Sequence, residues 1–232
     1  IVIPFASFIY FSNKENFYLN DAVNKPSVVK KVLANSITKI IFMKPKDKIG
    51  GVNESTLISD AIDYWDTLYE ELPKRNKHLF QTIDEKQIKN AFDIYCNRIA
   101  NNNNIILMKI CRSLSPISIF KPIVIEVTDL KLSYEIDYIK RRINKTNLPS
   151  TLIMNSEVLY FLFKNSFGFD TLTVNGCFEE GTKGGFIKAT KSLAIENLNN
   201  LGIYVNFKLL VNFRVIKLFF TRLYRVARKL ED

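Results

Sequence analysis

The stretch PIVIEVTDLKLSYEID, residues 122–137, decides the fold class of this chain. Its β-branched and aromatic residues lie on both sides of Thr128 and Asp129, a pattern typical of two strands joined by a turn. Segments with the period of an amphipathic helix precede this pair, and others follow it. The sequence therefore predicts an α+β fold in which helices accompany a small sheet.

The segments before the strand pair are predominantly helical. Pro26 suits the first turn of a short helix, and Asp84 is a good N-cap for a helix that runs to about Ala100. From Ser55 to Pro73, apolar residues recur on one helical face, whereas acidic residues lie away from it. The apolar positions of that face are Ile58, Ile62, Trp65, Leu68, Tyr69 and Leu72.

The segments after the strand pair predict more helix and a further strand. SEVLYFLFKNSFG predicts a helix capped by Ser156 and closed by Gly168, and residues 169–179 alternate like a strand with a turn at Asn175 and Gly176. A glycine-rich start at 181–185 precedes another helix that stops at Gly202. Residues 208–230 predict a basic amphipathic helix, packed on its own domain or lying on an anionic membrane.

The bulk composition is that of an ordinary globular protein. The 232 residues are 47% hydrophobic and carry a formal net charge of +10, but the basic residues are spread along the chain. Diffuse charge favours a solvated surface over a nucleic-acid interface. Three distant cysteines indicate a reducing compartment without disulfides, and no signal peptide or transmembrane stretch is apparent, so we expect a cytoplasmic protein.

Three local patterns resemble chemical sites, but each is interpreted as structural. The loop GTKGG at 181–185 lacks the spacing of a phosphate-binding P-loop, so we expect it to start a helix. Asp63 and Glu70 lie on one side of a helix, as a solvated face would place them. His78 is the only histidine, so a metal centre built wholly within this chain is not expected.

Two further strands are predicted near the N-terminus. Residues 1–11, IVIPFASFIYF, form an apolar run that predicts a buried strand, and residues 37–43 alternate like a second strand. A strand that is buried needs sheet neighbours, and residues 1–11 have none before them. We therefore expect this sequence to be the C-terminal portion of a longer protein.

The N-terminal residues also carry a family resemblance. The motif PFASF at 4–8 is followed by Phe11-Ser12 and by the EN-aromatic-x-N series at Glu15, Asn16, Phe17 and Asn20. MKPKD at 43–47 stands where relatives carry a Pro-Gly-Asp turn, with Lys46 in the glycine position. These motifs resemble the end of the catalytic domain in metallo-β-lactamase-fold hydrolases similar to ascorbate-phosphate lactonase-like enzymes and CMP-N-acetylneuraminate hydroxylase-like proteins.

This resemblance implies a fold, a cofactor and a partner. The fold is a two-layered β core flanked by helices, of the αββα type, and its divalent metal, zinc, is held by an HxHxDH motif in an upstream half. Residues 1–54 would be the distal end of that domain, and 55–149 a helical extension with a strand pair. Residues 150–232 would be a small α+β block similar to sterol-carrier modules. Without the metal motif the chain is expected to be inactive alone, with no cofactor of its own.

The resemblance also assigns candidate site residues. Ser12, Glu15, Asn16 and Asn20 would lie at the rim of the hydrolase site and orient a small-molecule substrate or the groups around the metal. The bond hydrolysed, a lactone, a phosphoester or an amide, is left open. An equally weighted alternative is that Asn16 and Asn20 satisfy backbone groups of a turn.

Two other function classes remain open. The block from residue 150 onward would be a non-enzymatic binding module with an apolar pocket for a lipid-like ligand. Alternatively, the chain would be a basic adaptor that touches nucleic acid or a membrane surface through its C-terminal tail.

Overall fold

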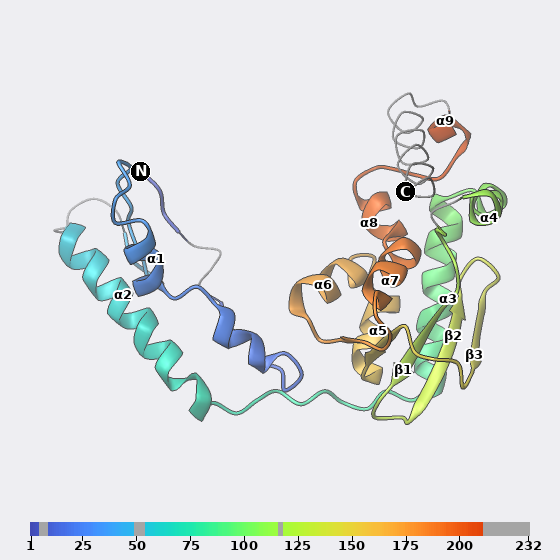
Figure 1. Ribbon diagram of the computed structural model, residues 1–232, viewed down its shortest axis with the longest axis horizontal. Coiled ribbons are helices and arrows are strands. Elements are labelled where there is room, and N and C mark those ends of the chain that lie inside the picture. Colours follow the sequence, from blue (N-terminus) through green and yellow to red (C-terminus); the bar gives the residue numbers. More distant parts are fainter. Residues whose placement is uncertain (5–8, 49–53, 116–117, 211–232) are drawn as a thin grey trace, which may run out of the picture. The chain divides into compact units, whose positions relative to one another are not determined.

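The computed structural model describes residues 1–4, 9–48, 54–115 and 118–210, and these divide into two compact units (Figure 1). Unit 1 comprises residues 1–79 and unit 2 comprises residues 80–232. Helices and a five-stranded mixed sheet together confirm the α+β class. The expected divisions after residues 54 and 149 differ from this boundary, because each of them falls inside one of the two units.

The described residues of unit 1 form two α-helices and two short 3-10 helices. They are α1 (Pro26–Val32), α2 (Glu54–Glu71), η1 (Phe17–Ala22) and η2 (Leu72–Lys74). One buried cluster consists of Phe42, Ala61 and Ile62, with Trp65 packed against it, and Ile41, Tyr69 and Leu72 are also buried. The predicted apolar face of α2 is therefore confirmed, and the helix ends just before Pro73 as expected.

The N-terminal residues do not form the buried strand that their composition predicts. Ile1 is 77% exposed, and Ile3, Ile9 and Tyr10 are also exposed. The only ladder contact in the described part of this run is a parallel bridge between Val2 and Ile40. Of the strand predicted over 37–43, the structure forms only this same bridge at Ile40, next to the buried Ile41 and Phe42. Apolar composition alone was misleading here, because too few described neighbours cover the run.

Unit 2 contains the sheet, in the order β3-β2-β1-β4-β5. Its strands are β1 (Ile123–Val127), β2 (Leu132–Asp137), β3 (Arg142–Lys145), β4 (Leu152–Met154) and β5 (Glu179–Glu180). The predicted hairpin of β1 and β2 is confirmed. Because β4 pairs with β1 in parallel, residues after 150 belong to the same sheet as residues before 149. A lipid pocket within that block remains a prediction.

Helices accompany this sheet in unit 2, and α7 contacts β1 and β4 directly. They are α3 (Glu85–Asn102), α4 (Ile105–Leu114), α5 (Ser156–Lys164), α6 (Gly168–Asn175), α7 (Gly185–Leu193), α8 (Ile195–Asn200) and α9 (Phe207–Leu210). Alternate strand residues such as Ile125, Tyr134 and Leu152 share one core with Phe92 of α3 and Phe163 of α5. Alternation along the strands thus gives the sheet one face that joins the helices.

Two helix predictions in unit 2 are confirmed and two details are wrong. Asp84 caps α3 by accepting a hydrogen bond from the Gln87 amide, and α7 starts after the glycine-rich turn. However, residues 168–175 are helical rather than extended, and Gly176, with φ of 64°, is the left-handed residue that ends α6. The bounds of α5 also differ: its N-cap is Asn155 rather than Ser156, and it ends at Lys164, whereas Gly168 begins α6 instead of closing α5.

The C-terminal amphipathic helix predicted over 208–230 falls mostly outside the described residues. Within them, α9 covers Phe207–Leu210, and Gly202, with φ of 76°, follows α8 as expected. In the part of the chain that the structure describes, no helix combines the length and apolar character that crossing a membrane requires.

Candidate functional site

Residues 11–20 of unit 1 form a loop that is held by its own asparagines. The Asn20 carboxamide oxygen accepts a hydrogen bond from the Phe11 amide at 2.8 Å, and its nitrogen donates to the carbonyls of Phe11 (2.9 Å) and Phe17 (2.8 Å). Asn16 is buried, and its carboxamide oxygen accepts from the Asn13 amide at 3.1 Å. These contacts match the alternative in which both asparagines satisfy turn backbone groups.

The other two candidate residues lie in the same loop with different surroundings. The Ser12 carbonyl accepts a hydrogen bond from the His78 amide at 2.8 Å, and the Lys14 amide donates to the His78 carbonyl at 3.0 Å. The His78 imidazole Nδ1 lies 3.0 Å from the Asn13 side-chain oxygen. Glu15 is exposed. The structure thus brings all four candidates together, with Ser12 and Glu15 outside the asparagine contacts that hold the loop.

A turn at residues 44–47 has the geometry that a glycine normally supplies. Lys46 adopts φ of 76°, in the left-handed region that disfavours residues with a side chain. The Asp47 carboxylate accepts a hydrogen bond from the Lys44 amide at 2.8 Å, and the Asp47 amide donates to the Lys44 carbonyl at 3.1 Å. This is the position where the Pro-Gly-Asp turn was expected from the resemblance.

An apolar groove of about 410 Å³ lies between α2 and residues 9–10, which directly precede the loop at 11–20. Trp65, Leu68, Tyr69 and Leu72 line it at helical spacings of three and four, and Ile9, Tyr10 and Arg75 complete it. The helical period predicted these α2 residues as a core face, and the groove was not predicted from the sequence. A visible signal was the length of that stripe, which continues past the small core of unit 1.

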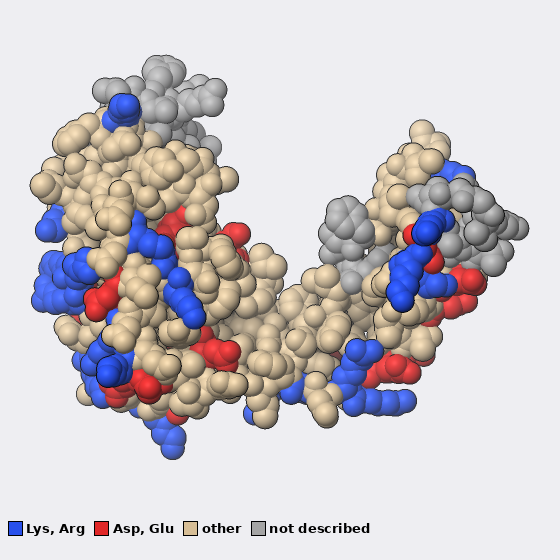
Figure 2. Space-filling view, turned by 180° about the vertical axis from the view of Figure 1, so that it is seen from behind, with Lys and Arg blue, Asp and Glu red and all other residues tan. Residues whose placement is uncertain are grey.

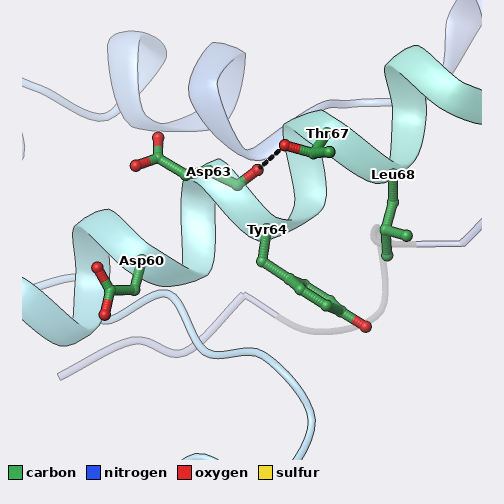
Figure 3. Close-up of a pocket in the computed structure, with 5 residues that line it drawn as sticks. All are labelled: Asp60, Asp63, Tyr64, Thr67 and Leu68. Atoms are coloured by element: carbon green, nitrogen blue, oxygen red, sulfur yellow. Dashed lines mark hydrogen bonds between the residues drawn. The ribbon is translucent and has the colours of Figure 1, made fainter.

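A second, more open hollow of about 480 Å³ lies on the other side of Leu68 (Figure 3). It is lined by Asp60, Asp63, Tyr64, Thr67 and Leu68, all from α2. The Thr67 hydroxyl donates to the Asp63 carbonyl at 2.8 Å, which is a contact within the helix. Since Asp63 and Glu70 are both exposed, this face has the surroundings of a solvated helix surface.

The glycine-rich turn at 181–185 is occupied by a residue of the chain itself. The Glu180 carboxylate accepts hydrogen bonds from the amides of Gly184 (3.2 Å) and Phe186 (2.9 Å) at the start of α7. A Cβ on Gly185 would stand 2.1 Å from the Thr151 carbonyl oxygen, so glycine permits close packing on the strand. A carboxylate already sits where a phosphate would bind.

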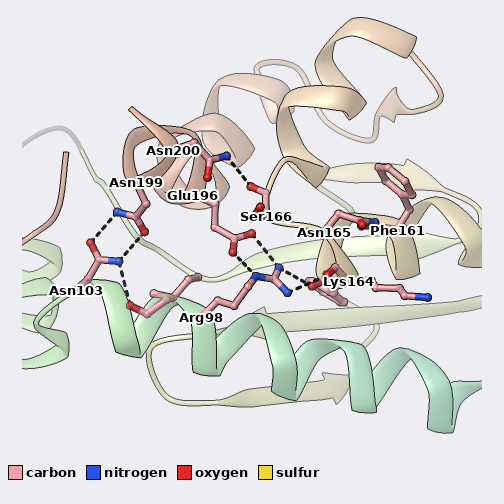
Figure 4. A network of polar contacts seen from close by, with 11 residues as sticks. Arg98, Asn103, Phe161, Lys164, Asn165, Ser166, Glu196, Asn199 and Asn200 are labelled. Carbon is pink, nitrogen blue, oxygen red and sulfur yellow. Dashed lines mark hydrogen bonds and ion pairs between the residues drawn. The ribbon is translucent and has the colours of Figure 1, made fainter. Parts of the chain in front are cut away.

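Unit 2 contains a buried polar cluster around Arg98 of α3 (Figure 4). The Arg98 guanidinium donates to the Glu196 carboxylate at 2.7 Å and to the carbonyls of Phe163 and Lys164 at the end of α5. Burial raises the pKa of Glu196, and Arg98 opposes that shift. Because Arg98 of α3 binds both the end of α5 and Glu196 of α8, it joins three segments that pack together, and the cluster has a structural role.

A second ion pair joins α4 to the end of β2. The Arg112 guanidinium binds both oxygens of Asp137 at 2.9 and 2.8 Å, and both side chains are largely buried. Burial alone would raise the pKa of Asp137, but the hydrogen bonds and charge of Arg112 lower it below its usual value. The pair is therefore ionised and structural at neutral pH.

The described residues offer no ready metal or thiol chemistry. They contain no group of three or more histidine, cysteine, aspartate and glutamate side chains that could hold a metal ion. Burial raises the pKa of the Cys96 thiol to about 12, which keeps it protonated at neutral pH. Basic and acidic side chains are interspersed over the face seen in Figure 2.

Comparison with known proteins adds no relative. No family model, no curated protein and no solved structure matches this chain.

Proposed function

We propose that this chain is a non-catalytic portion of a metal-dependent hydrolase of the metallo-β-lactamase superfamily. Zinc and its ligands would be supplied by sequence other than these 232 residues. Unit 1 would form the rim of the hydrolase site, with a small molecule as the substrate.

The observation that carries this proposal is the turn at Lys44–Asp47. The resemblance assigns a Pro-Gly-Asp turn to this position, and Lys46 adopts the left-handed conformation that such a glycine would have. A lysine accepts this conformation at a cost of about 1 kcal/mol. The turn geometry is therefore kept although the residue that favours it is absent.

The loop at residues 11–20, which Asn16 and Asn20 hold by hydrogen bonds, is consistent with the same proposal. Asn20 makes three hydrogen bonds to the loop backbone, which explains physically why the motif has an asparagine at this position. A loop that is held rigidly can present side chains to a ligand in a defined geometry. Glu15 is the exposed carboxylate of this loop and is our candidate for substrate contact.

Unit 1 also has a surface suited to the rest of such an enzyme. Ile1, Val2 and Ile37 are exposed near the bridge between Val2 and Ile40, and Ile37 is fully exposed. Burying apolar surface stabilises a contact by about 25 cal/mol per Å². We propose that the metal-bearing portion covers these residues.

The experiment compares this chain with a longer one. We would read the coding sequence that precedes Ile1, express the extended chain beside residues 1–232, and measure bound zinc and hydrolysis of lactone and phosphoester substrates. We expect an HxHxDH motif, bound zinc and turnover in the extended chain only. A preceding sequence without that motif, or an extended chain without zinc, would contradict the proposal.

The role of Glu15 is tested in the extended chain. We expect Glu15→Gln to raise KM roughly tenfold, since a charge-assisted hydrogen bond to substrate is lost. Glu70→Gln is the matched control, because Glu70 is an exposed carboxylate on α2 of the same unit. An unchanged KM for Glu15→Gln would remove Glu15 from the site.

A further inference from the structure

The groove in unit 1 has an apolar body and a cation at one end. We propose that it binds a linear aliphatic carboxylate, with the hydrocarbon chain along Trp65, Leu68 and Leu72 and the carboxylate at Arg75. This inference rests on the geometry of the groove and does not depend on the hydrolase proposal.

The polar atoms of the two large aromatic side chains on α2 are already engaged. The Trp65 indole nitrogen donates to the Met43 carbonyl at 2.9 Å, and the Tyr69 hydroxyl donates to the Ile9 carbonyl at 2.9 Å. Burial, together with the charge of Asp66, raises the pKa of Tyr69, so this phenol stays neutral. The groove therefore presents rings and methyl groups to a ligand.

The buried and exposed residues of the groove divide it into a floor and open walls. Tyr69 and Leu72 are 7% and 5% exposed and form the floor, whereas Ile9 is 49% exposed and stands at the edge. A hydrocarbon chain laid in the groove would cover the partly exposed walls. Each buried CH₂ group contributes about 0.8 kcal/mol to binding.

Arg75 supplies the charge that selects an anionic headgroup. Its guanidinium carbon lies 5.6 Å from the centre of the Tyr10 ring, which orients it beside the groove. Among the described residues no aspartate or glutamate forms an ion pair with Arg75. A guanidinium binds a carboxylate through two parallel hydrogen bonds, so this headgroup fits it better than a hydroxyl does.

The size of the groove suits a medium-length chain. From Trp65 to Glu71, where α2 ends, the backbone advances roughly 9 Å along the helix axis, and Arg75 lies four residues further along, just after η2. The volume of about 410 Å³ lies in the range of small-molecule sites. Decanoate is therefore a suitable probe.

The protein carries its own reporter for this test. Trp65 is the only tryptophan of the chain and lines the groove, so its fluorescence follows occupancy directly. We would titrate the full chain with decanoate and with decanol, below the concentrations at which either aggregates. We expect a saturable change with decanoate and binding of decanol at least tenfold weaker.

Two pairs of variants test the assigned ends of the groove. We expect Arg75→Gln to weaken decanoate binding at least tenfold and Lys77→Gln to leave it unchanged, because Lys77 lies over Phe17 and does not line the groove. Leu68→Glu should abolish binding by placing a carboxylate in the groove. The same change at the exposed Leu148 of unit 2 should have no effect.

Several results would overturn the inference. These are the absence of a saturable Trp65 signal with decanoate, equal binding of decanol, or unchanged binding by a folded Arg75→Gln variant. If Arg75→Gln or Leu68→Glu does not fold, as judged by circular dichroism, the comparison of decanoate with decanol on the unaltered chain decides.

Discussion

Unit 1 and unit 2 bury their apolar residues to very different extents. The core of unit 2 gathers side chains from its long helices and from the central strands of the sheet. Unit 1 buries fewer: its buried hydrophobic side chains among the described residues are Ile41, Phe42, Ala61, Ile62, Tyr69 and Leu72. Unit 1 depends more on local hydrogen bonds, such as those of Asn20, to hold its shape.

This difference shows how far each unit depends on burial for its stability. Both units expose large apolar side chains, among them Ile37 in unit 1 and Leu114 in unit 2, so exposure alone does not mark a binding surface. The groove of unit 1 is distinguished by the arrangement of its lining residues, and the Arg98 cluster of unit 2 by the segments that it joins. The following experiments sharpen this comparison, beginning with the largest expected effect.

Phe163 tests the claim that burial stabilises unit 2. It is fully buried in α5 and packs against Phe92 and Tyr95, so Phe163→Ala should lower the free energy of unfolding of this unit by about 3–5 kcal/mol. Hydrogen exchange of the α5 amides measures the loss. Phe161→Ala is the control, because Phe161 is exposed in the same helix. Equal losses in both variants would show that burial does not explain the stability.

Asp137 tests the buried ion pair of unit 2. Asp137→Asn leaves Arg112 without its carboxylate partner, and we expect a loss of about 3 kcal/mol at neutral pH. Because the pKa of Asp137 is lowered in the folded state, its contribution is complete above the unfolded pKa of about 4. The contribution then disappears as pH falls through the folded pKa. Urea unfolding at pH 7 and pH 2 should therefore show the variant and the original chain converging in acid.

Asn20 tests the claim that hydrogen bonds hold unit 1. Asn20→Ala removes three bonds to the loop backbone and should lower the stability of unit 1 by about 2 kcal/mol. Unfolding followed by Trp65 fluorescence reports this unit. Asn24→Ala is the control at an exposed position. An unaffected Asn20→Ala variant would mean that the loop is held by other contacts.

Lys46→Gly is expected to have the smallest effect on stability, and it should raise the stability of unit 1 instead of lowering it. Lys46→Gly should raise the stability of unit 1 by up to about 1 kcal/mol, because glycine adopts the left-handed conformation of this turn without a steric cost. The measurement is again the Trp65 unfolding midpoint. The same change at Lys48, which has no positive φ, should give no gain. A loss of stability at both positions would contradict the strain assigned to Lys46.

Three features that depend on residues close in the chain were predicted correctly from the sequence. They are the apolar stripe of α2, the Asp84 cap of α3 and the β1–β2 hairpin. A two-residue signal was less reliable. Asn175-Gly176 is typical of a hairpin turn, but Gly176 ends a helix whose Phe169 and Leu172 are buried three residues apart.

Features that depend on distant residues could not be predicted. The groove needs Ile9 and Tyr10 to meet α2, some sixty residues later, and nothing local in either segment signals that meeting. The four candidate residues lie in the loop at 11–20, and their expected place at the rim of a hydrolase site stays a prediction. The hydrogen bonds of Asn16 and Asn20 were anticipated only as an alternative, because sequence alone does not say which way a carboxamide turns.

The parallel pairing of β1 with β4 has a consequence for how the protein is made. During synthesis, β1, β2 and β3 emerge in order and pair through short turns, so this meander assembles early. The other edge of β1 has to wait for Leu152–Met154, about 25 residues further along. Until that segment leaves the ribosome, the nascent sheet exposes the edge of its most apolar strand to any neighbouring chain. A ribosome that stalls after β3 has left the exit tunnel but before Leu152–Met154 has emerged would therefore hold the nascent sheet with this edge exposed.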